Sequence, residues 1–375
     1  CNLPSLKQNV TVENTEFGTI VRAPFFPSLR DSLITSTSLP VLLFRKMLSV
    51  WQLLTEHFIA SSDNKRPIYE AAKTYLKENK VDIILACGEP FVLFRYASVL
   101  SLEFGIPWAG DYRDGWSTNY RWDDAQVYGL IQKLVQQRVE KKTIASAKLL
   151  TTAAPSFSSR ISTIAPFKTE EIPVIYNGYF EEMFDELEQI TEKKKFTIVH
   201  AGTLYYFQRV ETFLNGLNLF LIQNPEAEVD VNFFGLNFYP AQIERIKKVE
   251  CKANITFTDK IPHQQMLAEL ASSHLQLLVA TPEKHQIYGK VFDYTASGRP
   301  TLMVENDNGP LEWILSFQAN SFNASSVEEV STVISELYSD RSKTKRLKTG
   351  QGQFTRKNQT KRYVEEITRV LENKN

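Results

Sequence analysis

The sequence predicts an α/β protein of two domains, each built around a parallel β-sheet. The chain has 375 residues, and a chain of this length can bury more than one hydrophobic core. From Val81 onward, short apolar runs alternate with amphipathic stretches, which is typical of strand–helix–strand units. Residues 181–195 interrupt this alternation with acidic and then basic side chains and little apolar content, which favours an exposed linker between domains.

The composition argues against several classes of protein. The 43 Lys and Arg residues balance the 43 Asp and Glu residues, which argues against a nucleic-acid partner because binding to a phosphate backbone normally requires a basic excess. The three cysteines have no metal-ligand spacing and cannot all pair, which fits a reducing compartment. No apolar run approaches the roughly 20 residues of a membrane helix, and no charged-then-apolar leader opens the chain. We therefore expect a cytoplasmic protein.

The N-terminal region departs from a regular α/β pattern. The first seventeen residues are polar, with no opening strand and no glycine loop. We therefore expect the first strand of the first domain to be missing. Residues 40–54 then form an apolar run that contains Arg45 and Lys46. Such a run could lie on an anionic membrane surface, although we favour a helix that faces the core.

The first domain is expected to cover residues 1–185. Its predicted strands lie at 82–87, 106–110, 149–153 and 173–176, and its predicted helices at 91–104 and 125–145. Asn177 and Gly178, after the last of these strands, are a strong turn signal.

The second domain is expected to cover residues 186–358. Its predicted strands lie at 197–201, 229–234, 255–257, 275–279 and 301–304, and its predicted helices at 210–223, 240–249, 263–272 and from Lys290 onward. A closing helix within residues 359–375 is expected to pack back on the first domain.

The helix that begins near Lys290 carries the chemistry that indicates a nucleotide. A helix N-terminus presents unpaired backbone N–H groups and the positive end of the helix dipole, so it can hold phosphate. Lys290 adds a mobile positive charge there. Asp293 lies one turn later and can accept two hydrogen bonds from a vicinal diol such as a ribose. In the alternative interpretation, Lys290 is a solvated helix charge and Asp293 only complements the helix dipole.

This motif is the last of four that follow predicted strands, at the carboxyl ends where open α/β sheets bind ligands. In chain order they are Ile106-Pro-Trp-Ala-Gly-Asp111-Tyr-Arg113-Asp114-Gly-Trp116, Val174-Ile-Tyr-Asn177-Gly178-Tyr179, His200-Ala-Gly202-Thr203-Leu-Tyr205 with Arg209, and Lys290-Val-Phe-Asp293-Tyr with Ser297-Gly298-Arg299-Pro300. In this order and at these separations, the motifs resemble those of the retaining glycosyltransferase family 4 of the bacterial surface-polysaccharide type. The resemblance covers nearly all of the chain from about Val21 onward. It implies the GT-B fold, in which two Rossmann-like domains face a central cleft.

The resemblance also implies a nucleotide-diphosphate sugar as the donor substrate, with no cofactor and no metal. Backbone N–H groups near Gly202 and Thr203, together with Arg209 and Lys290, would neutralise the departing diphosphate in place of a divalent cation. Asp293 stands where the family commonly has a ribose-binding glutamate, and its side chain is shorter by one methylene. The structural alternative is a tight strand-to-helix turn at Gly202 and a solvated Arg209.

The catalytic candidates are Arg113, Asp114 and Glu283. The family often has a second glutamate eight positions before the ribose carboxylate, where this sequence has His285, so the nearby Glu283 could substitute. Arg113 stands where many relatives have a histidine. Because a guanidinium stays protonated at neutral pH, we assign Arg113 to sugar or phosphate contact and leave proton transfer unassigned. A salt bridge from Arg113 to Asp111 or Asp114 is the structural alternative.

The expected activity is the retaining, metal-independent transfer of a hexose-type sugar to a glycan or lipid-linked acceptor. Peripheral contact with the inner face of the cell membrane would suit a lipid-linked acceptor. Two alternatives stay open. One is a nucleotide-sugar epimerase of the same architecture, and the other is a degenerate or truncated scaffold that binds the donor without turnover.

Overall fold

A computed structural model describes residues 9–26, 29–33, 38–58, 64–122, 127–236, 240–281, 286–347 and 352–372. The chain forms two compact units. Unit 1 consists of Cys1–Thr152, Phe157–Val174 and Glu366–Asn375, and unit 2 of Ala153–Ser156 and Ile175–Glu365. The domain limits predicted from the sequence stay a prediction. No helix in the described ranges combines the length and the apolar content needed to cross a membrane.

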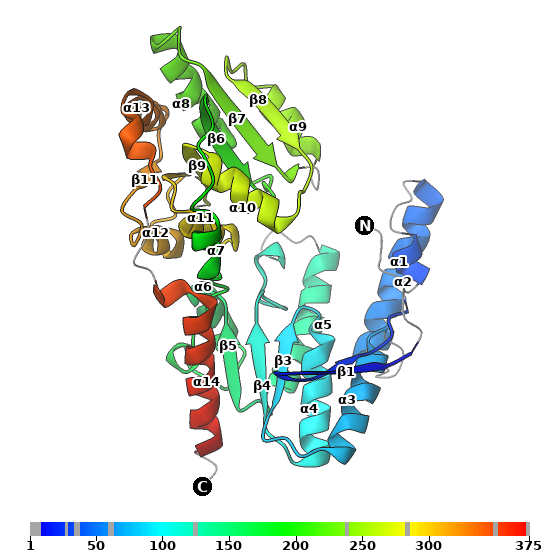
Figure 1. Ribbon diagram of the computed structural model, residues 1–375. Helices are drawn as coiled ribbons and strands as arrows, with labels where there is room; N and C mark the ends of the chain where they lie inside the picture. The colour runs from blue at the N-terminus through cyan, green and yellow to red at the C-terminus, as the bar shows by residue number, and fades with distance from the viewer. Residues whose placement is uncertain are drawn as a thin grey trace. The chain divides into compact units, whose positions relative to one another are not determined.

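Unit 1 contains a three-stranded sheet in the order β3-β4-β5, in which both pairs of strands are parallel. Its strands are β3 (Ile84–Gly88), β4 (Trp108–Tyr112) and β5 (Leu149–Thr152). Its helices beside the sheet are α3 (Arg66–Glu78), α4 (Val92–Phe104), α5 (Val127–Ile144) and α6 (Pro155–Ser162), which begins within unit 2 (Figure 1). The expected alternation of strands and helices is confirmed over this segment. The strand expected at 173–176 is wrong, because Val174 makes only a single bridge to Thr152.

An antiparallel hairpin precedes this sheet. It consists of β1 (Thr11–Thr15) and β2 (Gly18–Arg22), which pair with each other in a separate two-stranded sheet. A strand, β1, therefore lies within the first seventeen residues, where none was expected, but it is outside the parallel sheet, so the expected absence of that domain's first strand stays a prediction. Thr11, Val12 and Thr15 supply the β-branched side chains that favour extended backbone.

Two helices, α1 (Leu29–Ser32) and α2 (Leu39–Phe58), follow the hairpin. Between Leu39 and Trp51, the part of α2 whose side chains the structure describes, no side chain is buried. The favoured expectation of a core-facing helix is therefore wrong for this part of the chain.

Unit 2 is built on a six-stranded sheet in the order β11-β10-β9-β6-β7-β8, with every neighbouring pair parallel. Its strands are β6 (Phe196–Ala201), β7 (Val229–Phe234), β8 (Asn254–Thr258), β9 (Leu275–Val279), β10 (Thr301–Val304) and β11 (Ser321–Ala324). Read from β8, this is the 3-2-1-4-5-6 order of a Rossmann sheet. The strand order reverses between β6 and β9, and ligands of such sheets bind at the carboxyl ends of the strands at that point.

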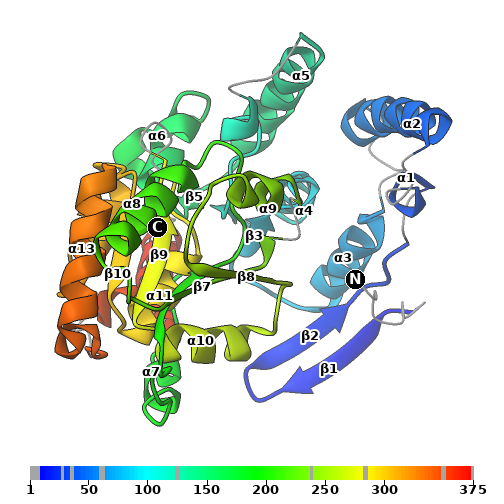
Figure 2. The ribbon, with the colours of Figure 1, turned by 90° about the horizontal axis from the view of Figure 1, so that it is seen from above.

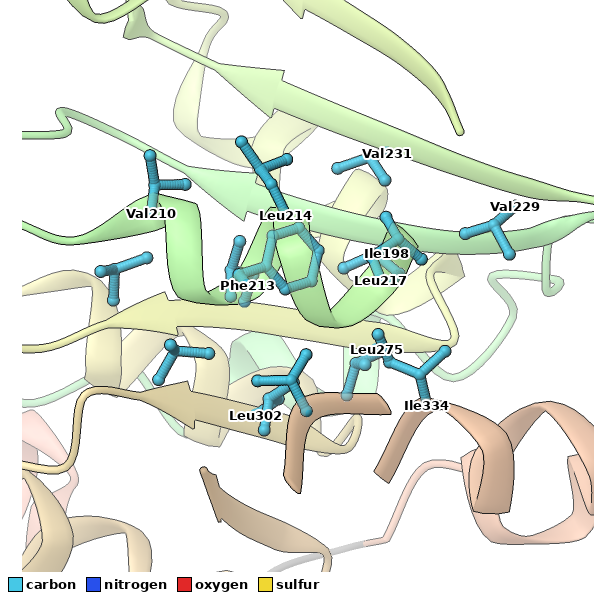
Figure 3. Close-up of a cluster of buried hydrophobic side chains, with 14 of the residues drawn as sticks. Ile198, Val210, Phe213, Leu214, Leu217, Val229, Val231, Leu275, Leu302 and Ile334 are labelled. Carbon is cyan, nitrogen blue, oxygen red and sulfur yellow. The ribbon is translucent and has the colours of Figure 1, made fainter. Parts of the chain in front are cut away.

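Helices cover both faces of this sheet (Figures 1 and 2). They are α8 (Val210–Gln223), α9 (Pro240–Lys247), α10 (His263–Ser272), α11 (Lys290–Ser297), α12 (Pro310–Leu315) and α13 (Val327–Ser339). Figure 3 shows the core beneath α8 and α13, in which Phe213 and Leu214 lie close to strand residues such as Ile198. Gly216 permits the close approach of these two helices, because a Cβ there would lie 2.5 Å from the Val330 Cβ.

The predicted linker contains one short helix, α7 (Glu182–Glu186), and is tied to the sheet by a buried arginine. Arg299 donates to Glu192 Oε1 at 2.5 Å, to Ala271 O at 2.6 Å and to Thr344 O at 2.8 Å. The arginine of the Ser297-Gly298-Arg299-Pro300 motif is thus a structural clamp. The chain closes with α14 (Arg356–Glu372), and its last turns, from Glu366, belong to unit 1.

Candidate functional site

The loop after β6 lies at the point where the strand order of unit 2 reverses. Gly202 has a φ of 85°, a left-handed conformation that favours glycine. Its N–H donates to Phe234 O at 2.8 Å, so this amide is used within the fold and not available to a ligand. Of the backbone N–H groups expected near Gly202 and Thr203, that of Gly202 is therefore engaged, and the role of Gly202 at the diphosphate stays a prediction. The next amide, that of Thr203, makes no hydrogen bond to any described residue.

Lys290 reaches from the first turn of α11 to this loop. Its Nζ donates to Thr203 O at 3.2 Å and lies 3.2 Å from His200 Nε2. It also lies 5.8 Å from the ring centre of Tyr288. The structure thus brings together two motifs that lie far apart in the sequence, since Lys290 and His200 are 90 positions apart.

His200 is a neutral partner for this lysine. It is fully buried, and its Nδ1 lies 3.0 Å from Leu277 O, which can only accept a hydrogen bond. Nδ1 therefore carries the proton, and Nε2 offers a lone pair to the ammonium of Lys290. Burial, reinforced by the charge of Lys290, holds the pKa of His200 well below its usual value. The sequence placed His200 in a motif but gave it no role.

No carboxylate pairs with Lys290 anywhere in the described ranges. Burial lowers the pKa of Lys290 to about 7, because the surrounding protein disfavours the charged form. A part-buried lysine that is held by neutral acceptors, with no counter-ion among the residues that the structure describes, is suited to bind an anion.

Asp293 lies one turn after Lys290 and contacts a residue that the sequence did not connect to it. Its Oδ1 lies 3.0 Å from Nε2 of His263, the first residue of α10. Burial raises the pKa of Asp293, and the neighbouring His263 and Arg356 oppose that rise. The carboxylate is thus partly sheltered and fixed by an imidazole. No local pattern could have shown this contact, because 30 positions separate the two residues.

Arg209 is not part of this group of contacts. It is exposed at the N-cap of α8 and makes no hydrogen bond or ion pair to any residue in the described ranges. Its neighbour Gln208 is buried and fixes the loop, since it donates to Val279 O and accepts from the N–H of Tyr205 at 2.8 Å. Sequence reasoning missed Gln208. Glu283 and His285 lie outside the described residues.

In unit 1, Arg113 forms one of the predicted alternative salt bridges. Its Nε lies 2.7 Å from Asp111 Oδ2, and Thr151 donates to the other carboxylate oxygen of Asp111 at 2.7 Å. Asp114 accepts from the N–H of Gly115 at 2.8 Å and from Asn119 Nδ2 at 2.7 Å. Both catalytic candidates of unit 1 thus contribute to the shape of the loop after β4.

A buried glutamate supports the same loop from α5. Glu140 is fully buried, and accepts from the hydroxyl of Tyr112 at 2.9 Å and from the N–H of Ser117 at 2.8 Å. Burial raises its pKa, and these donors oppose that rise. Sequence reasoning missed Glu140, because its neighbours Lys141 and Lys142 suggest a solvated helix face.

Comparisons with known proteins show the fold of the chain. No family model and no curated protein sequence matches it. Among solved structures, sucrose-phosphate synthase from Thermosynechococcus elongatus is 13% identical, with a TM-score of 0.62, over 99% of this chain and 87% of that one. An α,α-trehalose-phosphate synthase (UDP-forming) from Burkholderia vietnamiensis is 11% identical, with a TM-score of 0.62, over 98% and 89%. HepE from Anabaena, in complex with UDP-glucose, is 14% identical, with a TM-score of 0.56, over 82% and 84%. The expected GT-B type of α/β fold is confirmed.

Proposed function

We propose that the chain is a glycosyltransferase that moves a hexose-type sugar from a nucleotide-diphosphate sugar to a glycan or lipid-linked acceptor. The observation that carries this proposal is the placement of Lys290. Its ammonium lies at the switch point of the unit 2 sheet, held by His200 Nε2 and Thr203 O and without a carboxylate partner in the described ranges. A diphosphate would supply the missing negative charge.

In this proposal, different residues of unit 2 bind different parts of the donor. Lys290 and the Thr203 N–H bind the diphosphate, and Asp293 accepts from the ribose hydroxyls. His263 holds the Asp293 carboxylate in place from α10. Arg209, exposed at the N-cap of the helix that follows this loop, is assigned to the diphosphate as a further cation.

The charge that develops on the leaving diphosphate determines the chemistry of transfer. The bond between the anomeric carbon and the diphosphate oxygen breaks while a bond to the acceptor oxygen forms. We assign the acceptor proton to the leaving diphosphate oxygen on the same face of the sugar, which gives retention. Lys290 stabilises the departing charge, and this electrostatic contribution replaces that of a metal ion.

The HepE structure with UDP-glucose makes UDP-glucose the first donor to test. A thermal-shift panel of nucleoside diphosphates and nucleotide-sugars, in buffer with EDTA, should give at least one stabilising nucleotide-sugar. A ligand at about 100 times its dissociation constant adds roughly 2.7 kcal/mol of stability. The selected donor is then incubated with glycan and lipid-linked acceptors, and the anomeric configuration of the product is read by NMR. A panel with no stabilising member would overturn the proposal. Binding without product from any acceptor would favour the scaffold alternative.

A further inference from the structure

The apolar helix α2, whose place in the fold Figures 1 and 2 show, has its exposed side chains gathered on one face. Successive residues of a helix turn by about 100°. On this basis the exposed residues fall on one arc of about 160°. They are Leu39, Pro40, Leu43, Phe44, Lys46, Met47, Val50 and Trp51. Seven of these eight side chains are apolar.

The opposite side of α2 is partly covered. Val41, Leu42, Arg45, Leu48 and Ser49 are the partly covered residues of the same segment, and they share the remaining arc of the helix. The hydroxyl of Ser49 accepts from Arg30 Nε of α1 at 2.8 Å. The helix is therefore held through one side, which leaves the apolar arc pointing away from α1.

Several apolar side chains on this arc are largely exposed to solvent. Leu39 is 71% exposed, Met47 68%, Leu43 55% and Phe44 45%. Neighbouring exposed apolar residues at helical spacing form a patch, and patches of this kind mark interaction surfaces.

The charges around the patch indicate the class of partner. The only charged residue on the arc is Lys46, at its edge, and Arg45 adjoins it in sequence. The sequence has no acidic residue from Ser32 to Thr55. An apolar helix face bordered by a cation, with no acidic residue nearby in sequence, complements an anionic lipid surface, on which a helix can lie with its apolar face buried at the headgroup boundary.

We propose that α2 docks the protein on an anionic membrane surface, with Leu39, Leu43, Phe44, Met47 and Val50 entering the headgroup boundary and Lys46 meeting the anionic headgroups. This surface goes beyond the proposed function and does not depend on the donor site. It would bring the enzyme to acceptors that are anchored in a bilayer.

Co-sedimentation of the full chain with vesicles tests the proposal. The probes are vesicles of phosphatidylcholine alone and vesicles of phosphatidylcholine with phosphatidylglycerol. The native protein should bind the anionic vesicles. The triple variant Leu39→Gln, Leu43→Gln and Met47→Gln should bind them at least tenfold more weakly, since three exposed apolar contacts are lost. Lys46→Gln should weaken binding about fivefold, as expected for one cation near an anionic surface.

The matched control changes three exposed apolar residues elsewhere: Phe17→Gln, Leu102→Gln and Ile222→Gln, which are 91%, 75% and 55% exposed. This control should bind like the native protein. Because all these positions are exposed, every variant should keep its melting temperature and donor affinity.

Three results would overturn the proposal. The first is that the native protein does not bind anionic vesicles. The second is that the triple variant binds anionic vesicles with the same affinity as the control variant. A concentration-dependent dimer that only the triple variant dissolves, without vesicle binding, would assign the face to a second copy of the chain. Equal binding to neutral and anionic vesicles would overturn the role of Lys46.

Discussion

The Nζ of Lys290 lies 3.2 Å from Nε2 of His200, and this contact joins the first turn of α11 to the end of β6. His200 donates through its other nitrogen to Leu277 O, so towards Lys290 it acts as a neutral acceptor. The lysine is therefore oriented by uncharged acceptors. In the proposed function, this orientation would keep one cation available for a diphosphate at the largely buried carboxyl end of the sheet.

We predict that the affinity for UDP-glucose falls above pH 7. Burial lowers the pKa of Lys290 to about 7, so the free protein loses this proton as the pH rises through that value, whereas a bound diphosphate would retain it. Binding above pH 7 then requires proton uptake, and the Kd should rise by up to about tenfold for each pH unit. Below pH 7 the Kd should be nearly constant.

Calorimetry at several pH values above and below 7 measures how the Kd for UDP-glucose changes with pH. The control is Lys290→Arg, whose guanidinium stays protonated, so its Kd should not depend on pH in the same range. An identical slope in the native protein and in Lys290→Arg would show that another group titrates.

Asp293→Ala should weaken nucleotide binding by removing the acceptor for the ribose hydroxyls. Hydrogen bonds to a charged group contribute roughly 1.5 to 3 kcal/mol, so the Kd of UDP should rise about tenfold or more. The loss should be much smaller for the 2′-deoxyribose analogue of UDP, which lacks one of the two hydroxyls. The remote control Asp230→Ala should leave both values unchanged. An equal loss for the two nucleotides would remove Asp293 from the ribose.

Arg113→Ala should leave donor binding unchanged, in contrast to Lys290→Ala, if Arg113 belongs to the acceptor side. Its partner Asp111 keeps the hydrogen bond from Thr151, so the loop should stay folded. In Arg113→Ala, the donor affinity measured by calorimetry should therefore stay at the native value, while the initial transfer rate falls. A folded variant with an unchanged rate would limit Arg113 to the structural salt bridge with Asp111. An equal loss of donor affinity in both variants would place Arg113 on the donor.

His274 should make the protein less stable in acid. It is buried, its Nδ1 accepts from the N–H of Thr197 at 3.1 Å, and burial lowers its pKa from 6.5 to about 4. The unfolded chain therefore binds this proton first, and the free energy of unfolding should fall as the pH drops from 6.5 towards 4.

The full effect of His274 is about 3 kcal/mol at 1.36 kcal/mol for each pKa unit. Urea unfolding at several pH values measures it. His274→Asn, which keeps an acceptor but does not titrate, should flatten this part of the curve. A curve unchanged by the substitution would assign the acid sensitivity to other groups.

The sequence predicted most of unit 2 because its helices and strands follow local periodicity. The helix at 210–223 and the strands at 229–234, 275–279 and 301–304 agree with the structure at both ends. Prediction failed where strand pairing decides whether a segment forms a strand. The hairpin of β1 and β2 is an example, since its register depends on cross-strand contacts. It also failed for α2, because an apolar run cannot show whether its helix is covered.

The site was predictable only in part. Lys290, Thr203 and Asp293 could be named as candidates because motifs at strand ends converge in any Rossmann sheet, and Lys290 does contact Thr203 O; their roles stay predictions. His263 and Glu140 were not found, since their contacts with Asp293 and Tyr112 bridge 30 and 28 positions without a local pattern. The role of His200 also required the structure, because only packing shows which nitrogen faces Leu277.

Calorimetry of UDP-glucose, or of the panel member with the largest thermal shift, tests the central claim most directly. The native protein should bind the donor equally well with EDTA and with magnesium. Lys290→Ala should raise the Kd about tenfold or more, as expected for a lost charge-assisted hydrogen bond. The control Lys343→Ala, at an exposed lysine paired with Glu336, should bind like the native protein. Unchanged affinity in Lys290→Ala, or binding that EDTA abolishes and magnesium or manganese restores, would contradict the account.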